Sequence, residues 1–311
     1  MNNTQLIALQ KVLTKGGVTA LYATCKYGLG RFPENPKDLL KIIEILRGEG
    51  IFDYEVTLAQ LNRAMDDAER IVEESAEQGI GIVSYFDERF PEALKHFTKN
   101  GKQAYPLILY YKGNLKSAAE MYAIAVIGTR HPTEDGVRMA YHYGNYFSAQ
   151  GFNIVSGLAV GCDAVAHIGA LDAKGMTTAF VAHGLDIVPR QTEVAERIIA
   201  SGGAIVSEYP VGTPVGYQNL VERNRLQAGL SDAVILVQSD WKKGGSMHAV
   251  NVAIENKKPV FAVKFATEEA NSHPMSQGNM QLLKEKKARM LTPDNVKEVI
   301  DAVDNSDDIK E

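Results

Sequence analysis

The chain has 311 residues, 45% of them hydrophobic, and a formal net charge of -5 at pH 7. This length allows a sizeable buried core and favours one large domain accompanied by a smaller one. The negative charge argues against a generally basic coat for nucleic acid, but it is compatible with a local basic pocket. No apolar run approaches the ~20 residues that span a bilayer, and the N-terminus lacks the apolar core of a secretory signal. We therefore expect a cytoplasmic protein with no membrane partner.

The first 78 residues predict a small helical module. Apolar residues recur at steps of three and four, as in amphipathic helices, in "TQLIALQKVL", "PKDLLKIIEILRG" and "TLAQLNRAMDDAERIVEESAEQG". Residues 79–120 follow with two short strand patterns, "GIGIVS" and "YPLILYYKGN". Cys25 and Cys162 lie far apart without CxxC spacing, so the sequence supports neither a zinc site nor a disulfide framework.

From Met121 onward, short β-branched runs alternate with helical stretches. The runs are "YAIAVIG", "FNIVSG", "TTAFVAHG", "AIVSE", "AVILVQ" and "PVFAVK". Continuous apolar runs separated by helices are typical of a parallel sheet covered on both faces, so we predict a doubly wound α/β domain over residues 121–265. A C-terminal helix and an acidic tail are expected over residues 293–311.

The strand-to-helix turns of such a domain all lie at one rim of the sheet, where ligands bind. Small residues in these turns let backbone N–H groups at helix N-termini approach an anion closely. We therefore predict an anion cradle at this rim. Its members come from the first turn (Gly128, Thr129, Arg130), the second turn (Ser156, Gly157, Gly161), the third turn (His183, Gly184, then Arg190) and the loop after "AVILVQ" (Lys242, Lys243, Gly245, Ser246).

Arg130 is the strongest single candidate in this cradle. A guanidinium directly after a glycine at a strand end points at the cleft and can bind a phosphate through two hydrogen bonds. The glycines leave a simpler interpretation open, because a lone glycine after a strand often serves only the turn. Asp163 and His167 are four residues apart, which favours a local pair or a helix cap over catalysis.

Two further basic groups are open to more than one interpretation. Arg223 and Arg225 flank Asn224 and fit either a phosphate site or a charged helix face. Lys242 and Lys243 fit equally well a phosphate contact and a solvated loop.

Two common nucleotide-binding motifs are absent at the positions where they would be expected. GxGxxG does not follow the first strand, the second strand ends at Ser156 rather than at an acid that could hold a ribose, and GxxxxGK[ST] does not occur. Ser156, Cys162, Asp163 and His167 can be combined into a nucleophilic set, but nothing in their spacing demands it. We therefore expect a binding cleft and not an enzyme, with no catalytic residue, no cofactor and no metal.

Several stretches together carry a family resemblance. They are "AVIGTR", "IVSGLAVGCDAVAHIGAL", "GLDIVP", "GGAIVSEYPVGTP", "RNRLQAGLSDAVILV" and "VFAV". Through them the chain resembles the DNA-processing protein DprA (Smf) family over residues 79–292, most closely from Ala123 to Val263. The resemblance implies a Rossmann-like, mostly parallel sheet with lead-in strands at 79–120, which binds single-stranded DNA without hydrolysing it. It also implies a homodimer that protects incoming single strands and helps to load the RecA recombinase in natural transformation.

The same resemblance implies roles for particular residues. Phosphate contacts would come from the first turn (Gly128, Thr129, Arg130) and from the second turn (Ser156, Gly157, Gly161, Asp163). Further contacts would come from Arg190, just after Pro189, and from the arginine-rich motif (Arg223, Asn224, Arg225). The chain also departs from the family pattern. Val160 stands where a basic residue is usual, and "KKGGSMHAV" replaces the usual serine-rich loop while keeping Gly245 and Ser246. We expect no C-terminal winged helix.

A nucleotide-processing or nucleotide-sensing protein is the alternative function. Enzymes that resemble cytokinin-activating phosphoribohydrolases share this type of fold and carry PGGxGTxxE. The corresponding stretch here, "KKGGSMHAVNVAIE", has no acid at that spacing, which argues against hydrolysis. A sensor for a small nucleotide would use the same cleft, and the sequence leaves that possibility open.

Overall fold

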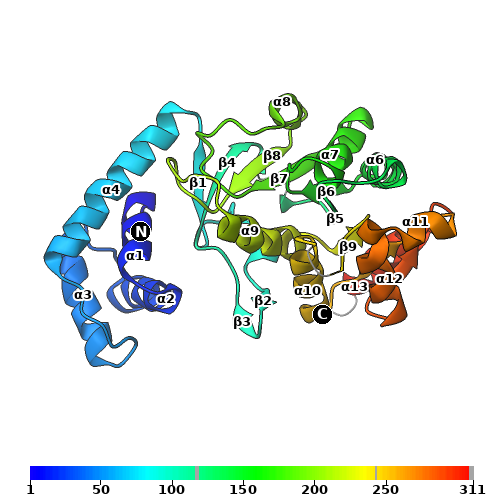
Figure 1. Cartoon of the computed structure of the whole chain (residues 1–311). Coiled ribbons are helices and arrows are strands. Elements are labelled where there is room, and N and C mark those ends of the chain that lie inside the picture. Colours follow the sequence, from blue (N-terminus) through cyan, green and yellow to red (C-terminus); the bar gives the residue numbers. More distant parts are fainter. Residues whose placement is uncertain (116–118, 242–243, 308–311) are drawn as a thin grey trace. The chain divides into compact units, whose positions relative to one another are not determined.

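The computed structural model describes residues 1–115, 119–241 and 244–307 (Figure 1). The chain forms two compact units: Met1–Asp87 with Leu107–Leu109, and Glu88–Pro106 with Tyr110–Glu311. The division predicted from the sequence, into residues 1–78, 79–292 and 293–311, stays a prediction about domains. A compact unit does not by itself show that a segment folds independently.

The first unit is mainly helical, as the sequence predicts. It contains α1 (Asn3–Val12), α2 (Lys15–Ala23), the π-helical turn Thr24–Leu29, α3 (Pro36–Gly48), α4 (Leu58–Glu77) and the strand β1 (Gly81–Ser84). Polar side chains begin these helices: Asn2 caps α1 and Thr57 caps α4, each in a capping box, and Asn35 caps α3. The apolar stripe of α4 is buried, as its three- and four-residue spacing requires.

The second unit contains the main sheet, whose strands follow the order β4, β8, β7, β6, β5, β9, β10, β11. Neighbouring strands are parallel except for β4, which pairs antiparallel with β8. The bounds are Ile108–Gly113 (β4), Ala123–Ile127 (β5), Asn153–Ser156 (β6), Thr177–Val181 (β7), Ala204–Ser207 (β8), Ala233–Leu236 (β9), Val260–Val263 (β10) and Arg289–Leu291 (β11). The six predicted runs are strands β5 to β10, and the predicted doubly wound, mostly parallel fold is confirmed.

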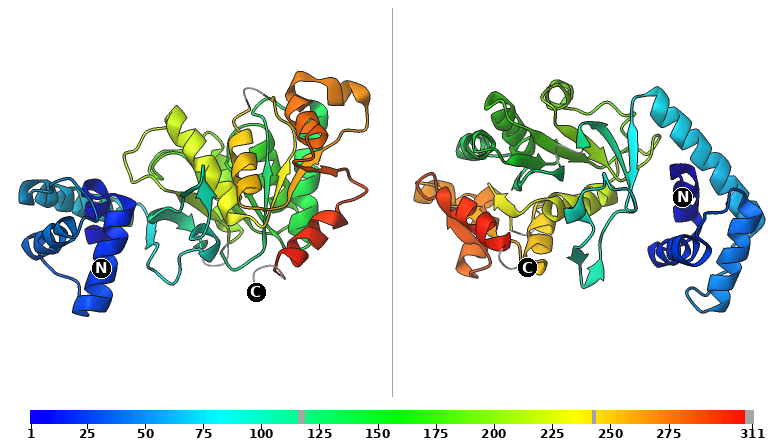
Figure 2. Two further views of the ribbon diagram at one scale, coloured as in Figure 1. Left: turned by 90° about the horizontal axis from the view of Figure 1, so that it is seen from below. Right: turned by 180° about the vertical axis from the view of Figure 1, so that it is seen from behind.

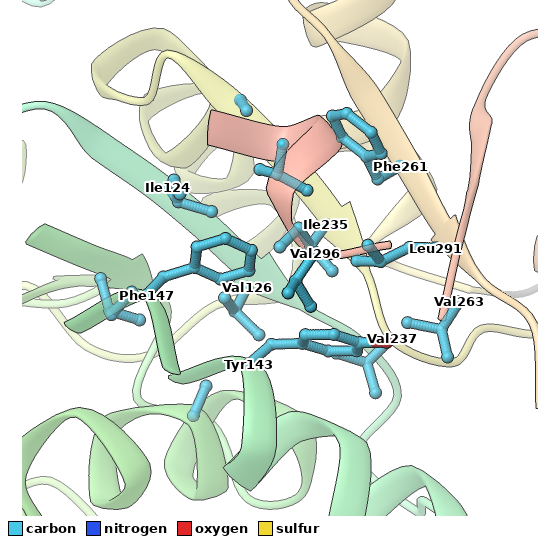
Figure 3. Packing of buried hydrophobic residues seen from close by; sticks show 14 of the residues in the cluster. Ile124, Val126, Tyr143, Phe147, Ile235, Val237, Phe261, Val263, Leu291 and Val296 are labelled. Carbon is cyan, nitrogen blue, oxygen red and sulfur yellow. The ribbon is translucent and has the colours of Figure 1, made fainter. Parts of the chain in front are cut away.

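Helices cover both faces of this sheet (Figure 2). Their bounds are Glu134–Ala149 (α6), Cys162–Asp172 (α7), Thr192–Ala200 (α8), Tyr217–Leu230 (α9), Met247–Glu255 (α10), Glu268–Ser272 (α11), Gln277–Lys284 (α12) and Lys297–Asp307 (α13). Figure 3 shows the core on one face, where Tyr143 and Phe147 of α6 belong to the same buried cluster as Val126, Ile235 and Phe261 of the strands. The adjacent helices α9 and α10 cover the other face. A short hairpin of β2 (Thr98–Lys99) and β3 (Lys102–Gln103) is anchored on α10 through Asn256.

Among the helices of the described ranges, none combines the length and the apolar content of a membrane-spanning segment.

Two glycines allow α6 and α7 to pack closely against each other. A Cβ atom at Gly144 of α6 would overlap the carbonyl oxygen of Ala166, and one at Gly169 of α7 would overlap the carbonyl oxygen of Tyr141. The contact of these backbones sets the position of α7, whose N-terminus lies at the carboxyl rim of the sheet.

Replacing Gly144 with alanine tests this contact. We expect Gly144→Ala to lower the free energy of unfolding by about 1–3 kcal/mol, because the added methyl group forces two packed helices apart. The measurement is urea unfolding followed by circular dichroism. Gly48→Ala is the control, since a Cβ atom at this helical position meets open space and the effect should stay within about 1 kcal/mol. Equal stability of both variants would contradict the tight crossing.

Candidate functional site

A pocket lies at the point where the order of the strands reverses. From β5 the chain proceeds through β6, β7 and β8 to one side and then returns through β9 on the other side of β5. The carboxyl ends of β5 and β9 therefore form a crevice, which is where ligands bind in open α/β sheets. A cavity of about 380 Å³ is found there. Its lining includes residues 127–131 at the end of β5 and just after it, several residues of α9 between 217 and 227, and residues 244–246 before α10.

The structure brings some of the predicted site residues together in this pocket and leaves others out. The lining contains Gly128, Thr129, Arg130, Asp163, Arg223, Asn224, Gly245 and Ser246. It does not contain Ser156, Gly157, Gly161, Arg190 or Arg225. Lys242 and Lys243 lie outside the described residues.

The first turn is held in place by its backbone, which leaves the Arg130 side chain exposed. The Thr129 N–H donates to the Gln238 carbonyl oxygen (2.7 Å), and the Cys162 N–H donates to the Thr129 carbonyl oxygen (3.1 Å). A Cβ atom at Gly128 would lie 2.8 Å from the Cβ of Cys162, so the close approach of β5 to α7 needs a glycine here. Arg130 is exposed and lines the pocket. Its side chain therefore borders the pocket from a turn that these backbone hydrogen bonds hold in place.

The second turn faces a carboxylate of this chain at the position where the sequence predicts a ligand phosphate. Asp163, in the first turn of α7, is only 7% exposed. Burial raises the pKa of Asp163. Four groups act in the opposite direction and lower it: the Arg223 guanidinium, the Ser156 hydroxyl and the backbone N–H groups of Gly128 and Gly157. The N-terminal end of α7 is thus occupied by a carboxyl group of the chain, which the Arg223 guanidinium faces.

Arg223 supplies a buried positive charge beside Asp163. Its Nη1 lies 3.9 Å from Asp163 Oδ2, and the residue is 4% exposed. Two donors point at the side-chain amide of Gln227. When the amide is oriented with its oxygen toward them, this oxygen accepts from the Gly157 N–H (2.8 Å) and from Arg223 Nη1 (2.6 Å). Within the described ranges, Arg223 Nε has no hydrogen-bond partner. Burial lowers the pKa of Arg223, Asp163 raises it, and the charge of Arg130 lowers it, so the two guanidiniums share one electrostatic environment.

Arg225 has a different place although it is only two residues away. It is buried, and its Nη2 donates to both carboxylate oxygens of Glu208 at 2.6 Å. Its Nε donates to the Ala104 carbonyl oxygen and its Nη1 to that of Glu222, both at 3.0 Å. These contacts join α9 to the segment after β8 and to the lead-in segment. Because Arg223 and Arg225 are both buried, a charged helix face is excluded as an interpretation of this motif.

The remaining predicted residues are placed as follows. Asn224 donates through Nδ2 to the Gly245 carbonyl oxygen (2.9 Å) and so ties α9 to the loop before α10. Arg190 is exposed and does not line the pocket. His167 is not paired with Asp163: its Nδ1 lies 2.6 Å from Thr177 Oγ1, and burial lowers its pKa to about 3.

Sequence reasoning missed an aromatic residue at the rim of the pocket. Tyr217, the first residue of α9, lines the cavity and is 80% exposed. An aromatic residue directly after a Gly- and Pro-containing loop, just before the arginine-rich motif, is the signal that could have identified it. Asp240 and Met275 also line the pocket and were not singled out.

The family model for DNA recombination-mediator protein A matches residues 81–304, and the chain belongs to this family. Protein Smf of Synechocystis sp. is 36% identical over 173 residues, which cover 54% of this chain and 43% of the relative. The DNA processing protein DprA of Bacillus subtilis is 32% identical over 195 residues, covering 62% of this chain and 64% of the relative. The chain thus matches less than two thirds of the length of either relative.

Solved structures of two DprA proteins share the fold. The protein from Streptococcus pneumoniae aligns with a TM-score of 0.73 and 23% identity, covering 94% of this chain and 95% of that chain. The protein from Helicobacter pylori, whose structure was reported for its mode of binding single-stranded DNA, aligns with a TM-score of 0.59 and 27% identity. That alignment covers 73% of this chain and 96% of the other.

The contacts of Arg225 predict that this side chain stabilises the fold. Arg225→Ala leaves the buried Glu208 carboxylate without its partner, so we expect the free energy of unfolding to fall by about 3–5 kcal/mol. Arg138→Ala, which removes an exposed arginine of α6 paired with Asp135, serves as the control and should change stability by at most about 1 kcal/mol. Urea unfolding of both variants measures the difference. Unchanged stability in Arg225→Ala would show that this side chain serves a ligand and not the fold.

Proposed function

We propose that this pocket binds single-stranded DNA through its phosphates and that the protein acts in DNA recombination as a binding protein and not as an enzyme. The observation that carries the proposal is the convergence of exposed Arg130 and buried Arg223 on one pocket at the switch point of the sheet. Membership of the recombination-mediator family supports it, as does the single-stranded DNA binding reported for the relative from Helicobacter pylori.

Arg130 is the proposed primary phosphate contact. The backbone of the preceding residue, Thr129, is tied to Gln238 and Cys162, so the turn that carries the guanidinium needs little ordering when a phosphate arrives. Planar guanidinium groups bind phosphate oxygens through two parallel hydrogen bonds. Arg190, Lys242 and Lys243 stay proposed contacts for neighbouring phosphates along the strand.

Tyr217 is the proposed contact for a base. A base next to a phosphate in the pocket can stack on this exposed ring, and stacking on an aromatic side chain tolerates every base. The bases of a duplex are already stacked and paired, so they are not accessible in this way. The site therefore favours single strands without strong sequence preference.

The finer parts of the proposal rest on family membership. They are protection of incoming single strands, loading of the RecA recombinase in natural transformation, a homodimeric state and a cytoplasmic location. A nucleotide sensor is the second candidate function, because a cavity of about 380 Å³ also suits one small nucleotide. Titration with oligothymidylate and with a panel of free nucleotides separates the two.

The contribution of Arg130 is tested by fluorescence anisotropy with labelled oligothymidylate at one fixed salt concentration. We expect Arg130→Ala to weaken binding about ten- to a hundredfold, because a charge-assisted hydrogen bond to phosphate is lost. Arg138→Ala, an exposed arginine outside the pocket lining, is the matched control and should change affinity about twofold at most. Equal effects of the two substitutions, or binding that is indifferent to salt, would place the DNA elsewhere.

A second pair of variants tests the role of Tyr217. Tyr217→Ala should weaken binding of oligothymidylate about five- to a hundredfold, since one stacked base is lost, whereas Tyr217→Phe should stay within about twofold. Both variants should melt like the wild type, because the side chain is exposed. If Tyr217→Phe were as weak as Tyr217→Ala, the hydroxyl group and not stacking would be the source of the contact.

A further inference from the structure

Asp163 is an unusual residue for the base of an anion-binding pocket. The N-terminus of α7, where the sequence pattern suggests a phosphate, has three of its N–H donors engaged within the chain. The Cys162 N–H donates to Thr129 O (3.1 Å), the Ala164 N–H to Ala159 O (3.0 Å) and the Val165 N–H to Gly161 O (3.1 Å). The Asp163 carboxylate lies in the first turn at the same helix end.

Asp163 also neutralises the deeper of the two arginines. Its carboxylate lies 3.9 Å from the Arg223 guanidinium, and both side chains are at least nine-tenths buried. No side chain fits at Gly157, since a Cβ atom there would overlap Arg223 and lie 2.6 Å from Asp163 Oδ2. The pair is therefore enclosed by the second turn, while Arg223 Nε has no hydrogen-bond partner among the described residues.

The charges of the described lining residues partly offset one another. Arg130 and Arg223 supply positive charge to the lining, and Asp163 lies 3.9 Å from Arg223 and offsets its charge. An internal phosphodiester carries one negative charge, whereas a terminal phosphate carries about 1.5 to 2 at pH 7. Among the described lining residues, Arg130 is the arginine whose charge Asp163 does not offset, and its single charge matches an internal phosphodiester better than a terminal phosphate.

We propose that Asp163 acts as a built-in anion that determines the class of ligand: it neutralises Arg223 at the N-terminus of α7 and so selects internal phosphodiesters of a strand over terminal phosphates and free nucleoside polyphosphates. This inference rests on the proposed function, because it describes how the same pocket distinguishes strands from nucleotides.

The test replaces Asp163 by asparagine and uses inorganic pyrophosphate and ATP, without added metal, as probes. Asn keeps the size of the side chain but removes its charge, which leaves Arg223 without a counter-ion. We expect the wild type to show no thermal shift with either probe, and Asp163→Asn to be stabilised by both and to bind them at least about tenfold more tightly. Asp163→Asn should likewise prefer a 5′-phosphorylated oligothymidylate over the 5′-hydroxyl form, while the wild type binds both alike.

Asp172→Asn is the matched control, because Asp172 is a half-exposed carboxylate of the same helix and pairs with Arg197 outside the pocket. It should behave like the wild type toward every probe. If Asp163→Asn does not fold in anion-free buffer, refolding in pyrophosphate becomes the readout, and recovery of the native circular dichroism spectrum supports the proposal.

Two results would overturn the inference: a folded Asp163→Asn that responds to pyrophosphate and ATP as the wild type does, or an unfolded one that neither probe restores. Failure of the proposed function is distinguishable from both, because it shows itself as a wild type that does not bind oligothymidylate at all. The gain of polyphosphate binding by Asp163→Asn does not depend on that result.

Discussion

The buried pair of Asp163 and Arg223 is the interaction on which the candidate site depends. Asp163 comes from α7 on one face of the sheet and Arg223 from α9 on the other, so the pair joins the two helical layers at the carboxyl rim. Burying two charges is costly unless each compensates the other and the remaining polar atoms find partners. The glycine at position 157 and the amide of Gln227 provide the close fit that this arrangement requires.

The arginine-rich motif of α9 separates a structural task from a binding task. Arg225 has all three of its donor nitrogens engaged, two of them with carbonyl oxygens and one with Glu208. Arg223 lines the pocket and keeps one nitrogen without a partner in the described part of the chain. Asn224, between them, ties the helix to the loop before α10. Three neighbouring residues thus have different tasks: Arg225 and Asn224 hold α9 in place, and Arg223 supplies a buried positive charge to the pocket.

The fold could be predicted from the sequence because local patterns determine it. Buried parallel strands need continuous β-branched runs, and each of the six predicted runs is a strand. The place of the first turn beside the pocket was also predictable, since strand-to-helix turns at the carboxyl ends of a doubly wound sheet border its crevice. The strand β11 was not predicted, because "ARML" is short and only its pairing with β10 makes it a strand.

The interior of the site could not be read from the sequence, because it depends on partners that are distant along the chain. Nothing near Arg225 predicts Glu208 as its partner, and the interpretation of both arginines changes once their burial is known. Asp163 resembles a helix cap or half of a local pair with His167, whereas its neighbour in space is Arg223, sixty residues away in sequence. Tyr217 gains its meaning only from its position at the rim of the pocket.

A crystal structure of the protein with a short oligothymidylate tests the central claim most directly. The account predicts a backbone phosphate within hydrogen-bonding distance of the Arg130 guanidinium, a base against the ring of Tyr217, and an Asp163 carboxylate that still faces Arg223. A strand bound away from the carboxyl rim, or a phosphate seated at the N-terminus of α7 with Asp163 displaced, would contradict it.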